Sequence, residues 1–246
     1  KFMKKVVLIT GASSKIGEAI SRELIKDYEV ILHYNTNENR ITTLKEELEK
    51  EYNKKELTIR CNLSCEEEID NMLKEIYSQY QNIDILINNA AITIDTVFED
   101  KTKENFIKTL DVNLVAPFLL SKKIGPKMKE NKDGIIINIS STNGIDTPYI
   151  ESIDYDASKA GLISLSNNLA NYLSPYVRVN TVCPGWINTD INKDLDKDFV
   201  AKEIDKILLG RFGEPEEVSH LIKFLVSDEA QYINNSIIRI DGGKRC

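Results

Sequence analysis

Short, wholly apolar runs alternate along this chain with longer stretches in which apolar residues recur at helical spacing. The first run, Val6–Thr10, lacks the polar alternation of a half-exposed strand, so it predicts a parallel strand covered on both faces. Further runs share this pattern: Val30–His33, Leu57–Cys61, Ile83–Ile87, Ile135–Ile139, Val177–Val182 and Ile237–Ile240. Strands that alternate with helices favour an α/β fold. We expect one doubly wound parallel sheet of seven strands, with helices on both faces, in a single domain over 1–246.

A long helical pattern runs from about Thr102 to Met128 and has Asn113 in its middle. An asparagine inside an apolar stretch is either a satisfied core amide or a site residue. The residues alone do not choose between these two interpretations.

The segment from Trp186 to about Gly213 has charged and apolar residues in no regular pattern and contains no strand. An irregular stretch of this length within a compact domain is usually a lid or a binding segment. We expect residues 186–213 to form a mobile substrate lid that closes over the substrate and excludes water.

The first strand leads into a loop that contains Gly11 and Gly17, and an amphipathic helix follows. Residues without large side chains let backbone N–H groups and the helix N-terminus approach a pyrophosphate. The candidate residues of this phosphate-binding loop are Gly11, Ser13, Ser14, Lys15, Ile16 and Gly17. The alternative is a tight turn without a ligand.

Tyr155 and Lys159 are four residues apart on an expected helix, so they lie on one face of it. A free phenol has a pKa of about 10 and is a poor acid or base at neutral pH. A neighbouring ammonium stabilises the phenolate, and lowering that pKa by roughly 3 units requires about 4 kcal/mol. The hydroxyl of Ser141 could then hold a carbonyl oxygen while Tyr155 transfers its proton. The spacing of tyrosine and lysine is a weak signal by itself.

The chain carries a net charge of −7, which disfavours nucleic acid as a main partner because phosphate binding needs a basic face. The apolar run at Val6 is too short for a signal sequence or a membrane span. Four cysteines without a paired framework suit a reducing compartment. Neither a histidine nor a second cysteine pair completes a metal site with Cys61 and Cys65. We expect a cytoplasmic protein without a metal or a membrane segment.

Several motifs, in their order along the chain, resemble the short-chain dehydrogenase/reductase family over nearly the whole length. The matching motifs are the glycine loop over 10–17, Asn88–Ala91, Ser141, Tyr155 with Lys159, and Pro184 with Gly185. The closing segments 210–218, 227–230 and 241–243 are similar to those of bacterial 3-oxoacyl-[acyl-carrier-protein] reductases. The resemblance implies a Rossmann-type fold and an NAD(P)-dependent oxidoreductase.

The resemblance also implies a catalytic tetrad of Asn113, Ser141, Tyr155 and Lys159. Tyr155 would be the general acid in reduction, and Ser141 would orient the carbonyl. Lys159 would lower the pKa of the tyrosine and bind the nicotinamide ribose, while Asn113 would hold a water that relays protons to Lys159. Ser141 is preferred over its neighbour at 140 because the second serine stands three residues before Gly144, as in the family.

The family's cofactor contacts correspond to residues that follow successive strands of the expected sheet. Beyond the glycine loop they are Tyr34, Asn35, Asn62, Leu63, Asn89, Ala90, Ala91, Tyr155, Lys159, Pro184, Gly185, Ile187 and Thr189. Asn62 replaces a frequent aspartate, but its side-chain oxygen can still accept from the adenine amino group. Ala91 replaces a glycine, and Lys15 replaces the middle glycine of the loop. Pteridine reductases also carry a basic residue at this last position, although they usually replace the serine that is retained here as Ser141.

The residues favour NADP(H) over NAD(H) as the cofactor. An enzyme that uses NAD usually has a carboxylate at the end of the second strand, where it accepts from the ribose 2′-OH. Here no acid follows His33 until Glu38. The repulsion that would exclude a 2′-phosphate is therefore missing, and Lys15 offers a positive charge. Arg40 is a second candidate, and an ordinary surface lysine is the alternative interpretation of Lys15.

The favoured function is an NADP-dependent carbonyl reductase, with 3-oxoacyl thioesters of fatty acid biosynthesis as the leading substrates. Reduction of another small ketone, sugar, steroid or pteridine is the alternative, because fold and tetrad do not choose between these substrates. The acidic stretch 192–198 in the expected lid disfavours an acyl carrier protein, which is itself acidic. A non-catalytic nucleotide-binding protein is disfavoured by the intact tetrad. The family also implies a homo-oligomer, either a tetramer or a dimer.

Overall fold

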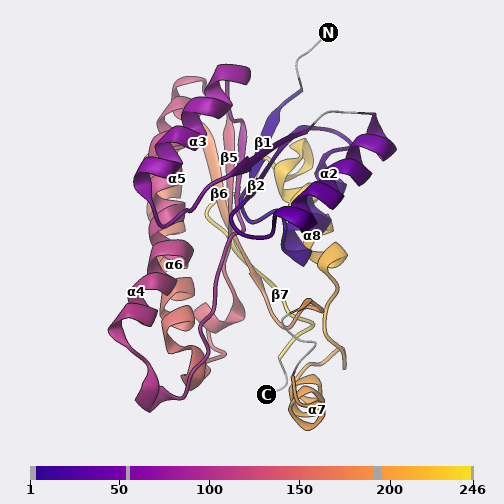
Figure 1. Ribbon diagram of the computed structural model, residues 1–246, viewed down its shortest axis with the longest axis vertical. Helices are drawn as coiled ribbons and strands as arrows, with labels where there is room; N and C mark the ends of the chain where they lie inside the picture. The colour runs from indigo at the N-terminus through magenta and orange to yellow at the C-terminus, as the bar shows by residue number, and fades with distance from the viewer. Residues whose placement is uncertain (1–3, 54–55, 191–194, 245–246) are drawn as a thin grey trace.

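The computed structural model describes residues 4–53, 56–190 and 195–244. Within these ranges one sheet holds seven parallel strands in the order β3-β2-β1-β4-β5-β6-β7 (Figure 1). The strands are β1 (Val6–Ile9), β2 (Glu29–Tyr34), β3 (Leu57–Arg60), β4 (Ile85–Asn88), β5 (Gly134–Ile139), β6 (Val177–Pro184) and β7 (Ile237–Ile240). The predicted doubly wound parallel sheet is thereby confirmed.

Helices connect the strands and cover both faces of the sheet. Within the described ranges the α-helices are α1 (Lys15–Leu24), α2 (Glu38–Tyr52), α3 (Glu66–Gln79), α4 (Lys103–Leu110), α5 (Ala116–Glu130), α6 (Ile153–Leu173), α7 (Lys197–Asp205) and α8 (Pro215–Val226). None of the helices in the described part of the chain is both long and apolar enough to cross a membrane.

Two separate hydrophobic cores lie on the two faces of the sheet. Helices α3, α5 and α6 pack on one face, and α1, α2 and α8 pack on the other (Figure 1). Alternate residues of β1 divide between the cores: Val6 and Leu8 face the first, and Val7 and Ile9 face the second. Burial on both sides explains why the strands appear in the sequence as unbroken apolar runs.

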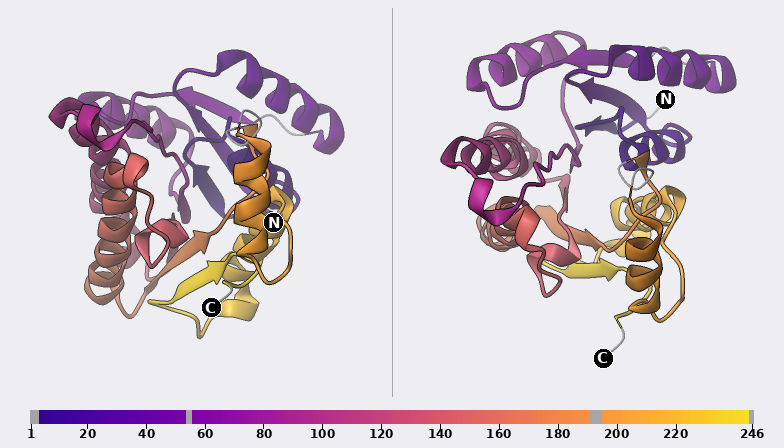
Figure 2. Two further views of the ribbon diagram at one scale, coloured as in Figure 1. Left: turned by 90° about the horizontal axis from the view of Figure 1, so that it is seen from below. Right: turned by 60° about the horizontal axis from the view of Figure 1, so that its bottom comes forward.

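The strand order reverses direction between β1 and β4, which are neighbours in the sheet although β2 and β3 separate them in the chain. In open α/β sheets, ligands bind in the crevice outside the carboxyl ends of the strands at this point. Figure 2 (left) looks onto that end of the molecule, where α7 lies beside β6 and β7. The candidate site residues lie along this edge.

The helix predicted over 102–128 is interrupted in the structure. Helix α4 ends at Leu110, a π-helical turn occupies Asp111–Val115, and α5 begins at Ala116. Such π-helical turns frequently mark functional sites. Asn113 lies at the centre of this turn.

Candidate active site

Close approaches that exclude side chains shape the loop between β1 and α1. Gly11 has a φ of +65°, and a Cβ added there would lie 2.8 Å from the Cα of Ala90. A Cβ at Gly17 would lie 2.3 Å from the carbonyl oxygen of Gly11. The loop therefore packs directly against the chain that follows β4, and glycine is required at both positions.

The N-terminus of α1 is placed to receive an anion. Ser14 is the N-cap, and its hydroxyl accepts from the backbone N–H of Gly17 at 3.1 Å. Lys15 is the first residue of the helix, so its backbone conformation suits any side chain and the replaced glycine is not needed. Ser13, within the loop, is buried, and Ile16 packs on the core. Backbone N–H groups and the helix dipole at such a terminus favour a phosphate group.

Asn89 connects the end of β4 to this loop. Its Nδ2 donates to the carbonyl oxygens of Thr10 and Gly11 at 2.9 and 3.1 Å. The hydroxyl of Thr10 accepts from the backbone N–H groups of Asn89 and Ala90, both at 3.0 Å. Ala91 does not have a left-handed φ, so alanine causes no backbone strain where the family has glycine. Hydrogen bonds thus link the segments that follow β1 and β4.

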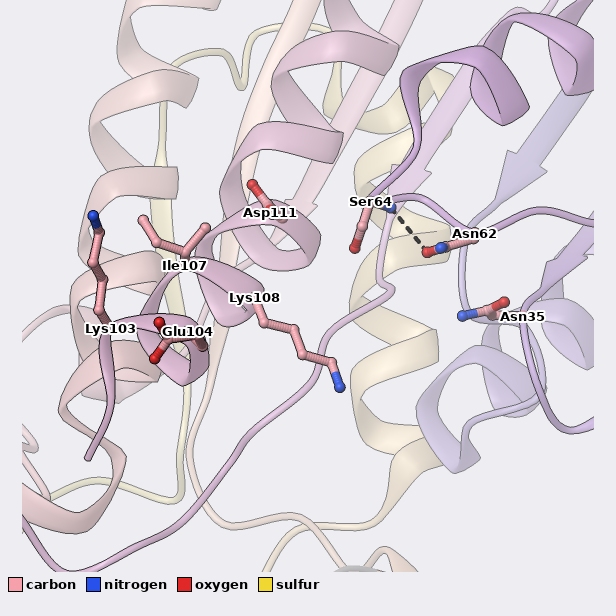
Figure 3. Close-up of a pocket in the computed structure, with 8 residues that line it drawn as sticks. All are labelled: Asn35, Asn62, Ser64, Lys103, Glu104, Ile107, Lys108 and Asp111. Carbon is pink, nitrogen blue, oxygen red and sulfur yellow. Dashed lines mark hydrogen bonds between the residues drawn. The ribbon is translucent and has the colours of Figure 1, made fainter. Parts of the chain in front are cut away.

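A pocket of about 610 Å³ lies beyond the carboxyl ends of β2 and β3 (Figure 3). Asn35 and Asn62 line it from the strand side, and Ile107 and Lys108 line it from α4. The Oδ1 of Asn62 accepts from the backbone N–H of Ser64 at 3.1 Å, which leaves one acceptor position on that oxygen. Lys108 extends from α4 into the space in front of Asn35 (Figure 3). No sequence pattern predicted that α4 lines this pocket, because a lysine on an exposed helix face has no distinguishing pattern.

Other predicted contacts near this pocket differ in what they can offer a ligand. Tyr34 ends β2 and is half-buried, whereas the side chain of Leu63 is buried in the hydrophobic core. Only the backbone of Leu63 is therefore available to a cofactor. Arg40 is already paired, because its guanidinium lies 2.5 Å from the carboxylate of Asp190 and 3.4 Å from that of Glu18.

The end of β6 contributes the remaining predicted contacts. Pro184 is the last residue of the strand, and the N–H of Gly185 donates to the carbonyl oxygen of Ile240 at 3.0 Å. A Cβ at Gly185 would lie 2.7 Å from the side chain of Asp241. Ile187 is buried, and Thr189 is half-buried. Ile187 and Thr189 stand where the chain leaves the sheet for the segment 186–213.

Tyr155 and Lys159 lie on α6, next to the end of β5. The Nζ of Lys159 is 5.3 Å from the centre of the Tyr155 ring and donates to the carbonyl oxygen of Ile139 at 2.8 Å. The hydroxyl of Ser141 is near enough to the phenol to lower its pKa, and it donates to the Oδ1 of Asn143 at 3.1 Å. Ser140 instead donates to the backbone carbonyl of Lys159 at 2.8 Å. This geometry supports Ser141 as the serine of the site.

Burial governs the protonation states of these groups. It raises the pKa of Tyr155 to about 12, and the interaction with Ser141 opposes this shift only in part. Burial also lowers the pKa of Lys159 to about 8. The net shift of the Tyr155 pKa is upward because loss of solvation is its largest cause. The phenol therefore stays protonated at neutral pH. The expected lowering of this pKa by Lys159 stays a prediction.

Asn113 is fully buried, and its side chain holds the backbone of a neighbouring segment. Its Oδ1 accepts from the N–H of Ile92 at 2.9 Å, and its Nδ2 donates to the carbonyl of Ile92 at 2.9 Å and to Ser158 at 3.1 Å. Both N–H donors are thus in use, and one acceptor position remains. These contacts do not test the predicted water relay to Lys159, which stays a prediction.

Comparison with known proteins agrees with the arrangement of these residues. A family model described as short chain dehydrogenase matches residues 5–199. This chain belongs to that family. It is 38% identical to a 3-oxoacyl-[acyl-carrier-protein] reductase of Aquifex aeolicus over 99% of this chain and 98% of that protein. Proteins of the same name from Rickettsia conorii and Staphylococcus epidermidis are 39% and 34% identical, over 97% and 98% of this chain and 96% and 99% of theirs.

As a short-chain dehydrogenase, the protein is an oxidoreductase that uses a nicotinamide cofactor, and the residues present fit that group. Gly11 and Gly17 let the loop pack closely on its neighbours, and the N-terminus of α1 that follows the loop can receive a diphosphate. The pocket at Asn35 and Asn62 lies on one side of this loop, as an adenosine group requires. Tyr155 lies on the other side, after β5 in the strand order, where the nicotinamide end belongs.

The segment 186–213 of this short-chain dehydrogenase is not the continuous irregular loop that we expected. Helix α7 occupies part of it, and residues 191–194 of the expected lid lie outside the described residues. Trp186 stacks on Phe212 at 5.4 Å between ring centres and meets Phe199 edge-on at 5.8 Å. The sequence did not reveal α7 because it has few apolar residues, none of which belongs to the two cores, and its Phe199 packs on this aromatic cluster. Mobility of the segment stays a prediction.

Sequence reasoning also missed Glu203, which is 4% exposed and joins α7 to the residues before α6. Its carboxylate accepts from the hydroxyl of Tyr149 and, at 3.1 Å, from the indole N–H of Trp186. Lys206 pairs with it at 2.5 Å. Burial opposes ionisation, but the hydrogen bonds, led by that of Lys206, lower the pKa of Glu203 below its usual value. The carboxylate therefore remains charged and binds two aromatic residues at once.

Proposed function

We propose that this enzyme reduces the 3-oxo group of an acyl thioester to a hydroxyl group, with NADPH as the reductant. The observation that carries the proposal is the grouping of Ser141, Tyr155 and Lys159, in which Ser141 acts on the phenol and the ammonium lies 5.3 Å from the centre of its ring. Support for a thioester comes from relatives that are 34–39% identical over nearly the whole chain and bear the name 3-oxoacyl-[acyl-carrier-protein] reductase.

The hydroxyls of Ser141 and Tyr155 are close enough to donate to one carbonyl oxygen. When bound, the nicotinamide supplies the hydride that adds to the carbonyl carbon. Tyr155, with a pKa of about 12, is protonated at neutral pH and gives its proton to the oxygen. The ammonium of Lys159, 5.3 Å from the ring centre, stabilises the phenolate that remains. Reprotonation of this phenolate completes the cycle.

NADP(H) as the preferred cofactor also belongs to this proposal. In support, β2 ends in Tyr34 without a carboxylate, and Lys15 at the N-terminus of α1 and Lys108 on α4 are positive charges beside the loop and the pocket. A homo-oligomer, either a tetramer or a dimer, remains a prediction from the family. The exposed apolar side chains of Val115 and Phe118 near the start of α5 support it.

The deciding measurement is the oxidation of NADPH with a short 3-oxoacyl thioester. At equal concentrations, kcat/KM should be higher for the thioester than for a simple ketone, a sugar ketone, a steroid or a pteridine. Faster turnover of the pteridine or the sugar would contradict the proposed substrate. Comparing the same acyl group on coenzyme A and on an acyl carrier protein would show whether the carrier is recognised.

Tyr155→Phe tests the assigned proton donor, because it keeps the ring and removes the acid. We expect kcat to fall by about 10²–10⁴ or more, while NADPH still binds. Tyr172→Phe is the matched control, since Tyr172 lies on the same helix with an exposed side chain and should leave kcat unchanged. Most of the activity surviving in a folded Tyr155→Phe enzyme would exclude Tyr155 as the donor.

A further inference from the structure

His33 is a buried histidine at the end of β2 for which the proposed reaction has no use. It is 1% exposed, and both of its ring nitrogens have backbone partners. The N–H of Gly11 donates to Nδ1 at 3.1 Å, and Nε2 lies 2.9 Å from the carbonyl oxygen of Cys61. A carbonyl oxygen only accepts, and a backbone N–H only donates. The proton of the neutral ring must therefore be on Nε2, with Nδ1 as the acceptor.

These contacts join three segments at the cofactor edge of the sheet. Gly11 belongs to the phosphate-binding loop after β1, and Cys61 follows β3. The backbone of His33 makes a further contact, because its carbonyl oxygen accepts from the N–H of Ala12 at 2.8 Å. Two consecutive peptides of the loop are thus held by one residue of β2. The next two residues, Tyr34 and Asn35, lead into the pocket expected to take the adenosine group.

The surroundings keep the ring of His33 neutral. Burial lowers its pKa to about 4, and its contact with Cys61 opposes this shift only in part. The thiol of Cys61, the residue after β3, is neutral as well, because burial raises its pKa to about 12. The charged groups that act on that thiol are Glu68 and Arg60. An acceptor at Nδ1 is therefore available to Gly11 throughout the neutral pH range.

We infer that His33 is a positioning residue of the cofactor site, whose unprotonated Nδ1 holds the Gly11 peptide and thereby orients the phosphate-binding loop and the N-terminus of α1. The left-handed φ of Gly11 is a conformation that needs such support, because a glycine loop is otherwise free to adopt many others. The inference rests on the proposed function only in taking the loop as the site of a dinucleotide diphosphate. It does not depend on which carbonyl compound is reduced.

Binding of ADP tests the inference without any turnover. His33→Leu removes the acceptor, and we expect the Kd of ADP, measured by calorimetry at pH 7.5, to rise about five- to tenfold. His33→Asn offers a side-chain oxygen near the position of Nδ1 and should restore the Kd to within about twofold of wild type. In turnover, the KM of NADPH should rise in His33→Leu while kcat changes little.

Leu32→Ala is the matched control, since Leu32 is a fully buried neighbour on β2 that faces the core. It should lower the melting temperature and leave the Kd of ADP unchanged. Unchanged ADP binding in a folded His33→Leu protein would overturn the inference. So would an equal loss of ADP affinity in Leu32→Ala, or equal losses in the Leu and Asn variants of His33, because either result indicates packing alone.

Nitrogen NMR of the wild-type histidine ring keeps the inference testable if His33→Leu does not fold. We expect a proton on Nε2 and an unprotonated Nδ1 from pH 8 down to about pH 5. A proton on Nδ1 in this range would overturn the inference. Failure of the proposed function is distinguishable, because it would abolish thioester reduction while leaving the ADP and NMR results as expected.

Discussion

The ammonium of Lys159 is placed where water is excluded. The residue is 2% exposed, and its ammonium donates to the carbonyl oxygen of Ile139. The nearby thiol of Cys183 does not offset the charge, because burial raises its pKa to about 11 and keeps it neutral. Desolvation therefore dominates and lowers the pKa of Lys159 to about 8. In the proposed mechanism, the ammonium that stabilises the phenolate of Tyr155 is present below this pH and is lost above it.

We predict that kcat for reduction falls as the pH rises through about 8. Tyr155 cannot account for the fall, because its pKa of about 12 keeps the phenol protonated over this range. The measurement is kcat at saturating NADPH and thioester from about pH 6 to 10, where one ionisation near the pKa of Lys159 should fit the profile.

The thiol of Cys183 is the competing titratable group, so Cys183→Ala is the control. The fall in kcat should stay at the same pH in this variant, because Lys159 retains its surroundings of backbone and α6. A midpoint that moves with Cys183→Ala, or a kcat that stays level up to pH 10, would contradict the role of Lys159.

For individual residues, the sequence predicted which side chains lie together in the site but not their protonation states. Tyr155 and Lys159 were found because their spacing places them on one helix face, whereas Ser141 was chosen over its neighbour at 140 by resemblance to the family. The direction of their pKa shifts depends on burial by segments that are distant in the chain. A local sequence pattern carries no information about that burial. His33 was missed for the same reason, since the partners of a core histidine are 22 and 28 residues away in the chain.

Among the elements, the strands were predicted to within about two residues, because parallel strands covered on both faces leave an unmistakable apolar signature. The π-helical turn at Asp111–Val115 was not predicted. It adds one residue to a turn and shifts the apolar pattern only slightly, so the segment still resembles a continuous helix. What marks it is Asn113, whose hydrogen bonds to Ile92 exist only in the folded chain.

Helix α7 depends on Glu203 for its attachment, and we predict that Glu203→Ala releases it. The variant loses the bonds to Tyr149 and Trp186 and leaves their donors without a partner, which typically costs about 1–3 kcal/mol. Amide hydrogen exchange in α7 should then become about tenfold faster, and the KM of the thioester should rise. If the segment 186–213 acts as a lid, NADP⁺ and substrate together should slow this exchange in the wild type.

Lys202→Ala provides the control for this experiment. Lys202 lies on the exposed face of α7, and alanine is a good helix former, so exchange should stay as in wild type. Tyr149→Phe should reproduce part of the effect of Glu203→Ala, because it removes one of the two aromatic donors. Unchanged exchange in Glu203→Ala would show that aromatic packing alone holds α7.

For the molecule as a whole, the negative net charge disfavours binding of an anionic cofactor. Thirty-two basic and 39 acidic residues give a net charge of −7, and a phosphorylated dinucleotide is also an anion. Binding therefore depends on a few local cations at the carboxyl edge of the sheet. Arg40 is one of these, but Asp190 and Glu18 already neutralise it. Lys15 at the start of α1 and Lys108 in the pocket form no ion pair within the described residues.

We predict that these two lysines set the preference for NADPH over NADH. A lysine contact with a phosphate contributes on the order of 1.5–3 kcal/mol, so Lys15→Ala should reduce the ratio of kcat/KM values for the two coenzymes about ten- to hundredfold. Lys108→Ala should reduce it less, because its side chain crosses an open pocket, and the double variant should approach no preference. The same variants should weaken binding of 2′,5′-ADP and leave that of 5′-AMP nearly unchanged.

Lys103→Ala controls for the general effect of removing a positive charge, because Lys103 lines the same pocket from one turn earlier in α4. It should change the coenzyme ratio little. Added salt should lower the affinity for 2′,5′-ADP more in the wild type than in the double variant, since screening acts on the charges that the double variant lacks. A wild-type enzyme that prefers NADH would refute the cofactor assignment itself. An unchanged ratio in Lys15→Ala would refute only the role of that lysine, and Lys108→Ala would then show whether α4 alone recognises the 2′-phosphate.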